Sequence, residues 1–200
     1  FALSPPYADL FAWLEGGEEP EADLSLAFRP MMLANPLEPE RFETLAPADH
    51  IAEIKWDGVR VQAAATRAGR RLYSRAGEDL APAFPDILAA MDWQGCVDGE
   101  LLVAIDGAPR PFAELQARLG RKRVTAKMLA EAPAHIRAYD LLHDGERDLR
   151  ALPLAERRAR LAAWIETHAP ARLDLSPEIP FETWDQLAAL RDAQRAEGQE

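Results

Sequence analysis

One lysine beside a tight turn is the residue of this chain best suited to covalent chemistry. Lys55 lies in the stretch Glu-Ile-Lys-Trp-Asp-Gly-Val-Arg, which runs from Glu53 to Arg60. If residues 51–56 form a strand, its alternation puts Glu53 and Lys55 on one face. Asp57-Gly58 is typical of a hairpin turn, and the return strand then brings Arg60 to the same side as Lys55.

A carboxylate, an amine and a guanidinium that meet in this way suit nucleophilic attack on a phosphate. An exposed lysine, with a pKa of about 10.4, is uncharged in only roughly one molecule in a thousand at neutral pH. Positive charge from Arg60 or from a bound metal lowers that pKa, and each unit gives roughly tenfold more of the reactive amine. The plainer alternative is a surface hairpin whose glutamate and lysine are solvated.

A second candidate site lies in the strongest strand signal, residues 96–105. Alternation places Asp98 and Glu100 on one face of this strand and apolar residues on the other. Two carboxylates on one strand face can hold Mg²⁺, a cation that prefers oxygen ligands. Because Asp-Gly is also a common turn, the alternative is a pair of carboxylates that binds no metal.

The composition is that of a globular domain. Of 200 residues, 48% are hydrophobic and 28% are charged, which fits one domain of good size or one domain with part of another. No stretch is long and apolar enough to cross a membrane. A single cysteine, Cys96, excludes an internal disulfide framework and fits a reducing cytoplasm, and we expect it to be a small buried side chain. The four histidines lack the spacing of a zinc site.

The charge pattern favours local contact with nucleic acid over general affinity. A net charge of −11 argues against nonspecific coating of nucleic acid. The basic residues from Arg118 to Arg123 form the best local candidate for contact with a phosphate backbone, and the alternative is a solvated helix end. Only three of the 23 basic residues are lysines, and of the two types only lysine offers a readily titratable amine.

The remaining pattern alternates strands with helices. Residues 15–23 are predicted to form an acidic linker. Further strands are predicted at residues 71–75, 136–142 and 172–175, and helices at residues 4–14, 39–46, 83–91, 111–120, 152–168 and 181–196.

Four segments resemble motifs of the covalent nucleotidyltransferases, which comprise ATP-dependent DNA ligases, RNA ligases and mRNA capping enzymes. Lys-Trp-Asp-Gly-Val-Arg at 55–60 is similar to their Lys-x-Asp-Gly-x-Arg signature, and Ser-Arg-Ala-Gly-Glu-Asp at 74–79 resembles a second element of DNA ligases. Asp-Gly-Glu-Leu-Leu-Val at 98–103 resembles the third motif. Tyr139 precedes Asp-Leu where the family usually has phenylalanine. Their order and spacing are similar to those of bacterial ATP-dependent DNA ligases.

The resemblance implies an α+β fold, a nucleotidyltransferase (ATP-grasp-like) core of antiparallel β-sheets flanked by helices, with ATP between the sheets. It implies that residues 1–27 are the tail of an upstream helical DNA-binding domain with a linker. Residues 28–200 would then be an adenylation domain that is incomplete at its C-terminus. The family's next motif begins with a glutamate, which is expected at Glu200.

The same resemblance assigns the covalent step to Lys55. Its amine would attack the α-phosphate of ATP, release pyrophosphate and form a lysine–AMP intermediate. Glu53 would accept a hydrogen bond from the adenine amino group, and Tyr139 would stack on the adenine ring, since tyrosine keeps the aromatic face that phenylalanine offers.

Four further site residues are implied by the resemblance. Arg60 and Glu100 would engage the ribose or the metal, and Arg75 would contact the nucleotide and the nick phosphate. Mg²⁺ would be held by Glu100 and Glu200.

The implied activity is the joining of 5′-phosphate and 3′-hydroxyl ends at nicks in double-stranded DNA, in repair, replication or recombination. Such a protein would be a cytoplasmic monomer that needs ATP and Mg²⁺ and no membrane. Two alternatives remain open: an RNA ligase or capping-type nucleotidyltransferase, and a noncatalytic nucleic-acid-binding module on the same fold. The segments at 74–79 and 112–116, which resemble DNA ligases, speak against the first alternative.

Overall fold

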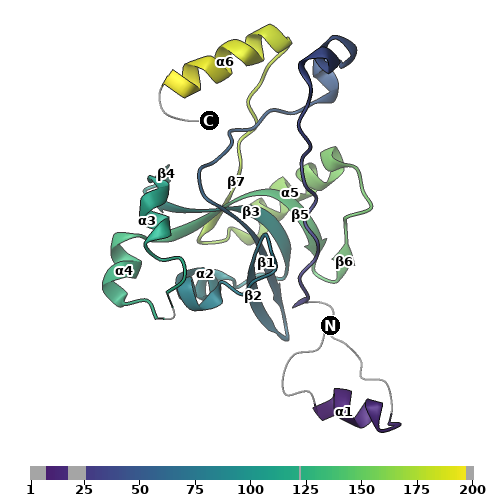
Figure 1. The fold of residues 1–200 in the computed structure, drawn as a ribbon, viewed down its shortest axis with the longest axis vertical. Coiled ribbons are helices and arrows are strands. Elements are labelled where there is room, and N and C mark those ends of the chain that lie inside the picture. Colours follow the sequence, from purple (N-terminus) through teal and green to yellow (C-terminus); the bar gives the residue numbers. More distant parts are fainter. Residues whose placement is uncertain (1–7, 18–25, 122, 197–200) are drawn as a thin grey trace.

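The centre of the molecule is a mostly antiparallel sheet. A computed structural model describes residues 8–17, 26–121 and 123–196. Within them, seven strands form a sheet with the order β2-β1-β3-β5-β6, and β4 joins β3 while β7 joins β5 (Figure 1). All pairs are antiparallel except β5 with β7, which is parallel. The predicted α+β class is confirmed, with one parallel pair that the sequence did not indicate.

The described elements are as follows in chain order. The strands are β1 (Val59–Thr66), β2 (Gly69–Ser74), β3 (Gly95–Ile105), β4 (Ala108–Pro109), β5 (Ala134–Asp144), β6 (Arg147–Asp148) and β7 (Leu173–Leu175). The α-helices are α1 (Ala8–Leu14), α2 (Pro85–Ala90), α3 (Phe112–Gln116), α4 (Ala126–Glu131), α5 (Leu154–His168) and α6 (Trp184–Ala196). Three short 3-10 helices are η2 (Pro39–Thr44), η3 (Pro47–Asp49) and η4 (Ala81–Ala83).

One face of the sheet is apolar and is covered by helices. The alternation predicted for β3 is confirmed, because Val97, Leu101 and Val103 are buried in the main core. Ile87 of α2 and Leu161 of α5 belong to the same core, so helices distant in sequence pack on that face. Burial of this apolar surface is what holds the strands in register.

The opposite face of the sheet is mainly polar, apart from a small buried apolar cluster that includes Cys96, and a segment of the chain lies over it. The buried side-chain amide of Gln62 in β1 accepts a hydrogen bond from Arg29 N (2.8 Å) and donates one to Arg29 O (3.0 Å). Tyr73 of β2 donates to Leu26 O at 2.8 Å. The backbone of residues 26–32 is therefore fixed to the sheet by side chains.

Helix boundaries follow local capping. Thr183 Oγ1 accepts a hydrogen bond from Gln186 N at 3.1 Å, which starts α6 three residues later than predicted. Helix α5 follows Pro153 and ends at His168, and the next residue, Ala169, has a left-handed φ of 43°. Both helices were predicted, and both are shorter at the N-terminal end.

The predicted strand at residues 51–56 is wrong. This segment is extended, but Glu53 alone forms a bridge, with Glu178, and the first strand begins at Val59. The proposed hairpin across Asp57-Gly58 therefore does not exist. The bridge partner of Glu53 comes from a part of the chain that is remote in sequence.

Helix α6 packs against η2 and away from the sheet. Helix α6 lies apart from the sheet at the top of Figure 1, where Trp184 packs edge-on against Phe42 of η2 and donates to Leu45 O at 3.0 Å. Among the described helices, none has both the length and the apolar character needed to span a bilayer.

Candidate active site

A cavity of about 510 Å³ lies beside the polar face of the sheet, a size that suits a small-molecule ligand. Five of the six residues predicted for the nucleotide site line it, and they come from the segment before β1 and from three strands. These residues are Glu53, Lys55, Arg60, Glu100 and Tyr139. Apolar side chains at its edge include Met32, Leu33 and Leu154.

The segment that carries Lys55 is anchored on both sides of the lysine. Trp56 Nε1 donates to Ser176 Oγ at 3.1 Å, and the guanidinium carbon of Arg137 lies 4.2 Å from the centre of a Trp56 ring. On the other side, Glu53 bridges to Glu178. Lys55 therefore borders the cavity on a short segment that is held in place on both sides of the lysine, at Glu53 and at Trp56.

Glu53 is a partly buried carboxylate beside a buried arginine. Its Oε1 atom lies 3.2 Å from Arg158 Nη1 but has no hydrogen-bond donor among the described residues. Burial raises the pKa of Glu53, as do the nearby carboxylates of Glu178 and Asp140, while Arg158 and the Ser176 hydroxyl lower it. Glu53 thus lines the cavity with its buried Oε1 atom beside the guanidinium of Arg158.

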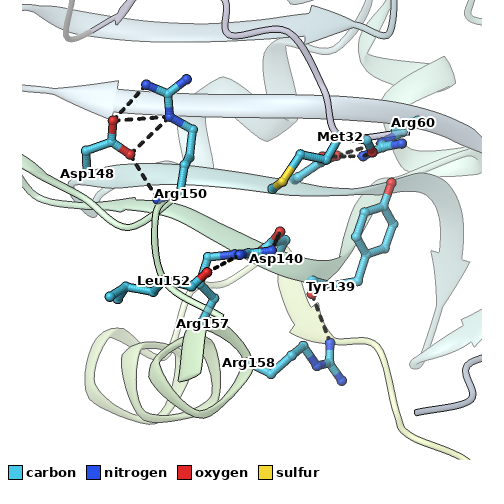
Figure 2. Close-up of polar contacts among 10 residues, drawn as sticks. Met32, Arg60, Tyr139, Asp140, Asp148, Arg150, Leu152, Arg157 and Arg158 are labelled. Atoms are coloured by element: carbon cyan, nitrogen blue, oxygen red, sulfur yellow. Dashed lines mark hydrogen bonds and ion pairs between the residues drawn. The ribbon is translucent and has the colours of Figure 1, made fainter. Parts of the chain in front are cut away.

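Arg60 is fixed by a forked ion pair across two strands. Its Nε and Nη2 atoms donate to Asp98 Oδ1 at 3.0 Å and Oδ2 at 2.6 Å, and Nη2 also donates to Met32 O at 2.8 Å (Figure 2). The hydrogen bonds to Asp98 raise the pKa of Arg60. Asp98 had been considered as a metal ligand with Glu100, but Arg60 occupies both of its oxygens.

Glu100 is the carboxylate of β3 that remains available for a ligand. Burial raises its pKa to about 7, the charges of Asp98 and Asp57 add to the rise, and Arg60 and Lys55 oppose it. A divalent cation with a phosphate ligand would favour the ionised form of this carboxylate. Mg²⁺ often binds through one carboxylate together with substrate phosphates, so a single available carboxylate fits. Among the described residues, no three acidic, histidine or cysteine side chains gather as metal ligands.

A bulge aims Tyr139 into the cavity. In the register of β3 with β5, Asp98 faces Asp140 and Gly99 faces Ala138, which leaves Tyr139 as the extra residue. Its ring centre lies 5.6 Å from the guanidinium carbon of Arg60, and burial raises the pKa of its phenol above the ordinary value. A neutral ring at the cavity wall can stack on a planar ligand.

Two motif glycines are required by close backbone approach. A Cβ atom at Gly58 would lie 2.4 Å from Leu101 O, and one at Gly99 would lie 2.8 Å from Arg137 O. Gly58 was expected to supply a positive φ for a turn, and it does not have one. The glycines instead let β1, β3 and β5 close around the site.

Two predicted contact residues, Arg75 and Arg118, do not line the cavity. Arg75 is exposed in the turn after β2 and is not part of the cavity wall, so its contact with nucleotide stays a prediction. Glu200 lies outside the described residues. Arg118, predicted as part of a phosphate-binding cluster, is fully buried and ion-paired to Asp86, so that part of the prediction is wrong because the side chain faces the core. Arg121 and Arg123 of that cluster are exposed, while Lys122 is outside the described residues.

Two functional candidates were missed by sequence reasoning. Arg157 at the start of α5 lines the cavity and donates to both oxygens of Asp140, at 2.8 and 2.9 Å (Figure 2). Arg158 is 5% exposed and contacts Glu53. The helix at residues 152–168 was predicted, but adjacent arginines on a helix give no sign of which ones turn inward.

The chain is similar in sequence to known DNA ligases. Residues 31–200 match the family described as ATP dependent DNA ligase domain. A probable DNA ligase of Koribacter versatilis is 38% identical over 156 residues, which cover 75% of this chain and 27% of that protein. A DNA ligase of Archaeoglobus fulgidus is 30% identical over 193 residues, covering 93% of this chain and 34% of that protein. The chain thus spans about a third or less of the length of these relatives.

Solved structures give the same result. The ligase domain of M. tuberculosis LigD matches with a TM-score of 0.55 and 26% identity, over 75% of this chain and 45% of that one. A mycobacterial DNA ligase D complexed with ATP and MES matches with a TM-score of 0.54 and 26% identity, over 75% of this chain and 46% of that one. With the family match across residues 31–200, these likenesses show that the chain belongs to the ATP-dependent DNA ligase domain family.

Proposed function

We propose that this chain is the adenylation domain of an ATP-dependent DNA ligase that seals nicks through a covalent lysine–AMP intermediate. The observation that carries the proposal is the convergence of Lys55 with Glu53, Arg60, Glu100 and Tyr139 around one cavity. Residues 28–200 are proposed as this domain and residues 1–27 as the end of an upstream DNA-binding region with its linker.

The first step is attack by the amine of Lys55 on the α-phosphorus of ATP. The nitrogen lone pair forms the P–N bond, the bond from the α-phosphorus to the bridging oxygen breaks, and its electrons leave with pyrophosphate. The amine must be uncharged to attack, and the proton that it loses passes to solvent. The fixed positive charge of Arg60 favours the uncharged amine.

The base of ATP is proposed to bind between Glu53 and Tyr139. The position of Glu53 in the cavity wall supports a role as acceptor for the amino group of adenine, since carboxylates accept and cannot donate when ionised. The ring of Tyr139 supplies the stacking surface. Arg60, held by Asp98, is proposed to engage the ribose.

Mg²⁺ is proposed to be held by Glu100, together with Glu200. When bound, this ion supplies positive charge that offsets the charge on the phosphates. Glu100 supports the assignment because Arg60 leaves its oxygens available while binding both oxygens of Asp98.

The later steps act on nicked double-stranded DNA. AMP passes from Lys55 to the 5′-phosphate of the nick, and the 3′-hydroxyl then displaces AMP to join the strand. Arg75, exposed beside β2, is proposed to contact the nick phosphate. A monomeric, cytoplasmic protein that serves DNA repair, replication or recombination completes the proposal.

The test is adduct formation by the full-length protein with ATP and Mg²⁺. We expect a mass increase of one AMP that is lost in Lys55→Ala and kept in Lys127→Ala, a control lysine that is paired with Glu131 on exposed α4. Absence of any adduct in the unchanged protein would favour a noncatalytic binding module. An adduct with GTP in place of ATP would favour a capping-type enzyme.

A further inference from the structure

Arg158 of α5 contacts three other parts of the candidate site, which are the segment of Glu53, strand β5 and the chain after β7. It extends from α5, and its Nη1 lies 3.2 Å from Glu53 Oε1 and its Nε 3.3 Å from Glu178 Oε1. Nη1 also donates to Tyr139 O at 3.2 Å (Figure 2), and Nη2 donates to Ser176 O at 2.8 Å. A side chain that is 5% exposed thus fixes the carboxylate of Glu53 relative to β5 and to the chain after β7.

The protonation of Glu53 decides which purine it can bind. An ionised carboxylate only accepts hydrogen bonds, whereas a protonated carboxyl group also donates one. Adenine presents an amino donor at the ring position where guanine presents a carbonyl acceptor. An ionised Glu53 therefore accepts from adenine and repels guanine, while a protonated Glu53 can pair with either base.

We propose that Arg158 is a positioning and specificity-determining residue, which keeps the carboxylate of Glu53 ionised and oriented so that the site takes adenine and rejects guanine. This inference rests on the proposed function, in which Glu53 contacts the base.

The groups around Glu53 act on its pKa in opposite directions. Glu178, next to β7, and Asp140, on β5, are acidic neighbours that favour the protonated form, as burial does. Arg157 of α5 already neutralises Asp140 through a forked ion pair. Arg158 is the cation that directly faces Glu53 from α5, and the Ser176 hydroxyl adds a hydrogen bond with the same effect.

The test compares ATP with GTP in formation of the Lys55 adduct by the full-length protein. Arg158→Gln is expected to lower the ratio of kcat/KM for ATP to that for GTP by roughly 10-fold or more near neutral pH. The matched control is Arg160→Gln on the same helix, whose arginine is paired with Glu156 outside the cavity. The control is expected to keep the ratio of the unchanged protein.

A pH profile separates this role from a loss of packing. Without Arg158 the pKa of Glu53 rises, so selectivity for ATP is expected to decrease as the pH is lowered and to recover as the pH is raised. Arg158→Lys keeps a positive charge and is expected to restore part of the selectivity. A purely structural role for Arg158 would change the rates without this recovery at high pH.

Two further variants test the inference even if Arg158→Gln fails to fold. Glu53→Gln carries a donor at every pH and is expected to show the low selectivity without any dependence on pH. Glu178→Gln removes an acidic neighbour that is about half exposed, so it is expected to extend the selectivity for ATP to lower pH than in the unchanged protein.

The possible results distinguish failure of the proposed function from failure of the inference about Arg158. If the unchanged protein forms no adduct with any nucleotide, the proposed function fails. If it forms the adduct with ATP and a folded Arg158→Gln keeps the full preference for ATP over the whole pH range, the inference about Arg158 is overturned while the proposed function stands. A Glu53→Gln variant as selective as the unchanged protein would overturn it as well.

Discussion

Asp98 holds Arg60 by a two-point ion pair that crosses from β3 to β1, and the side chain of Asp98 is only 1% exposed. The same guanidinium donates to Met32 O. One buried carboxylate therefore positions Arg60 directly and, through Arg60, the backbone of Met32 beside the cavity.

Replacing Asp98 with asparagine tests this relationship. Asp98→Asn keeps the size of the side chain but removes the charge, so Arg60 loses its fixed position near the substrate. We expect adduct formation to fall in kcat/KM by roughly 10- to 100-fold, since small displacements of positioning groups are costly. The measurement is the rate of adduct formation with ATP. Glu156→Gln, at an exposed ion pair on α5, serves as the control, and an equal loss in both variants would contradict the prediction.

Gly58→Ala tests the close approach of the strands. The new methyl group would lie 2.4 Å from Leu101 O and 2.8 Å from the Glu100 side chain, so the backbone must shift. The expected loss in free energy of unfolding is about 1–3 kcal/mol, measured by urea denaturation. Asp57→Ala, at the exposed neighbouring position, is expected to change stability by at most about 0.5 kcal/mol. A Gly58→Ala protein as stable as the unchanged one would contradict the steric argument.

The buried pair of Asp86 with Arg118 makes a pH-dependent contribution to stability. Burial alone would raise the pKa of Asp86, but hydrogen bonds from Arg118 and Ala134 N outweigh it and hold the pKa below the ordinary value of 3.8. A carboxyl group with a lowered folded-state pKa stabilises the fold above its unfolded-state pKa, and this contribution is lost as the pH falls through the folded-state pKa.

Asp86→Asn is therefore expected to cost about 3 kcal/mol at neutral pH, because a fully buried arginine loses its partner. The difference from the unchanged protein should shrink only below about pH 4. Denaturation at several pH values measures it. Asp192→Asn, at an exposed pair on α6, is expected to have little effect, and a difference that persists unchanged in acid would refute the linkage.

Cys96 is expected to resist thiol reagents in the folded protein. It is 1% exposed, and burial raises its pKa to about 12, so only roughly one thiol in ten thousand is ionised at pH 8. Alkylation should be slow in buffer and fast in denaturant. Mass spectrometry follows the reaction, and rapid labelling of the native protein would show that the thiol is accessible.

Much of the site was predictable because its motifs are local. Glu100 and Lys55 each occur in a short run whose residue types already indicate the chemistry, and the alternation of β3 correctly separated its polar face from its apolar face. The bulge at Tyr139 was not predictable, because it depends on the register between two strands rather than on either strand's sequence.

The errors share a different cause, which is contact between residues far apart in the chain. Arg118 was read as a surface cation because its partner Asp86 lies in α2, which is remote from Arg118 in sequence. Residues 51–56 were read as a strand because Glu178, the bridge partner of Glu53, is remote in sequence. Charged residues that are buried in pairs look like solvated ones until both members are placed.

Residues 26–32 form a wall over the polar face of the sheet, and this wall is attached differently from the strands beneath it. Gln62, Arg60 and Tyr73 hold the backbone of residues 26–32 through side chains, whereas β1 is held on both edges by continuous ladders to β2 and β3. Separation of the wall breaks these hydrogen bonds and the packing of Leu26 and Phe28 on the sheet, and it leaves every ladder intact. Peptide hydrogens in this wall should therefore exchange with deuterium sooner than those of β1, and the cavity has a side that can open without unfolding the sheet.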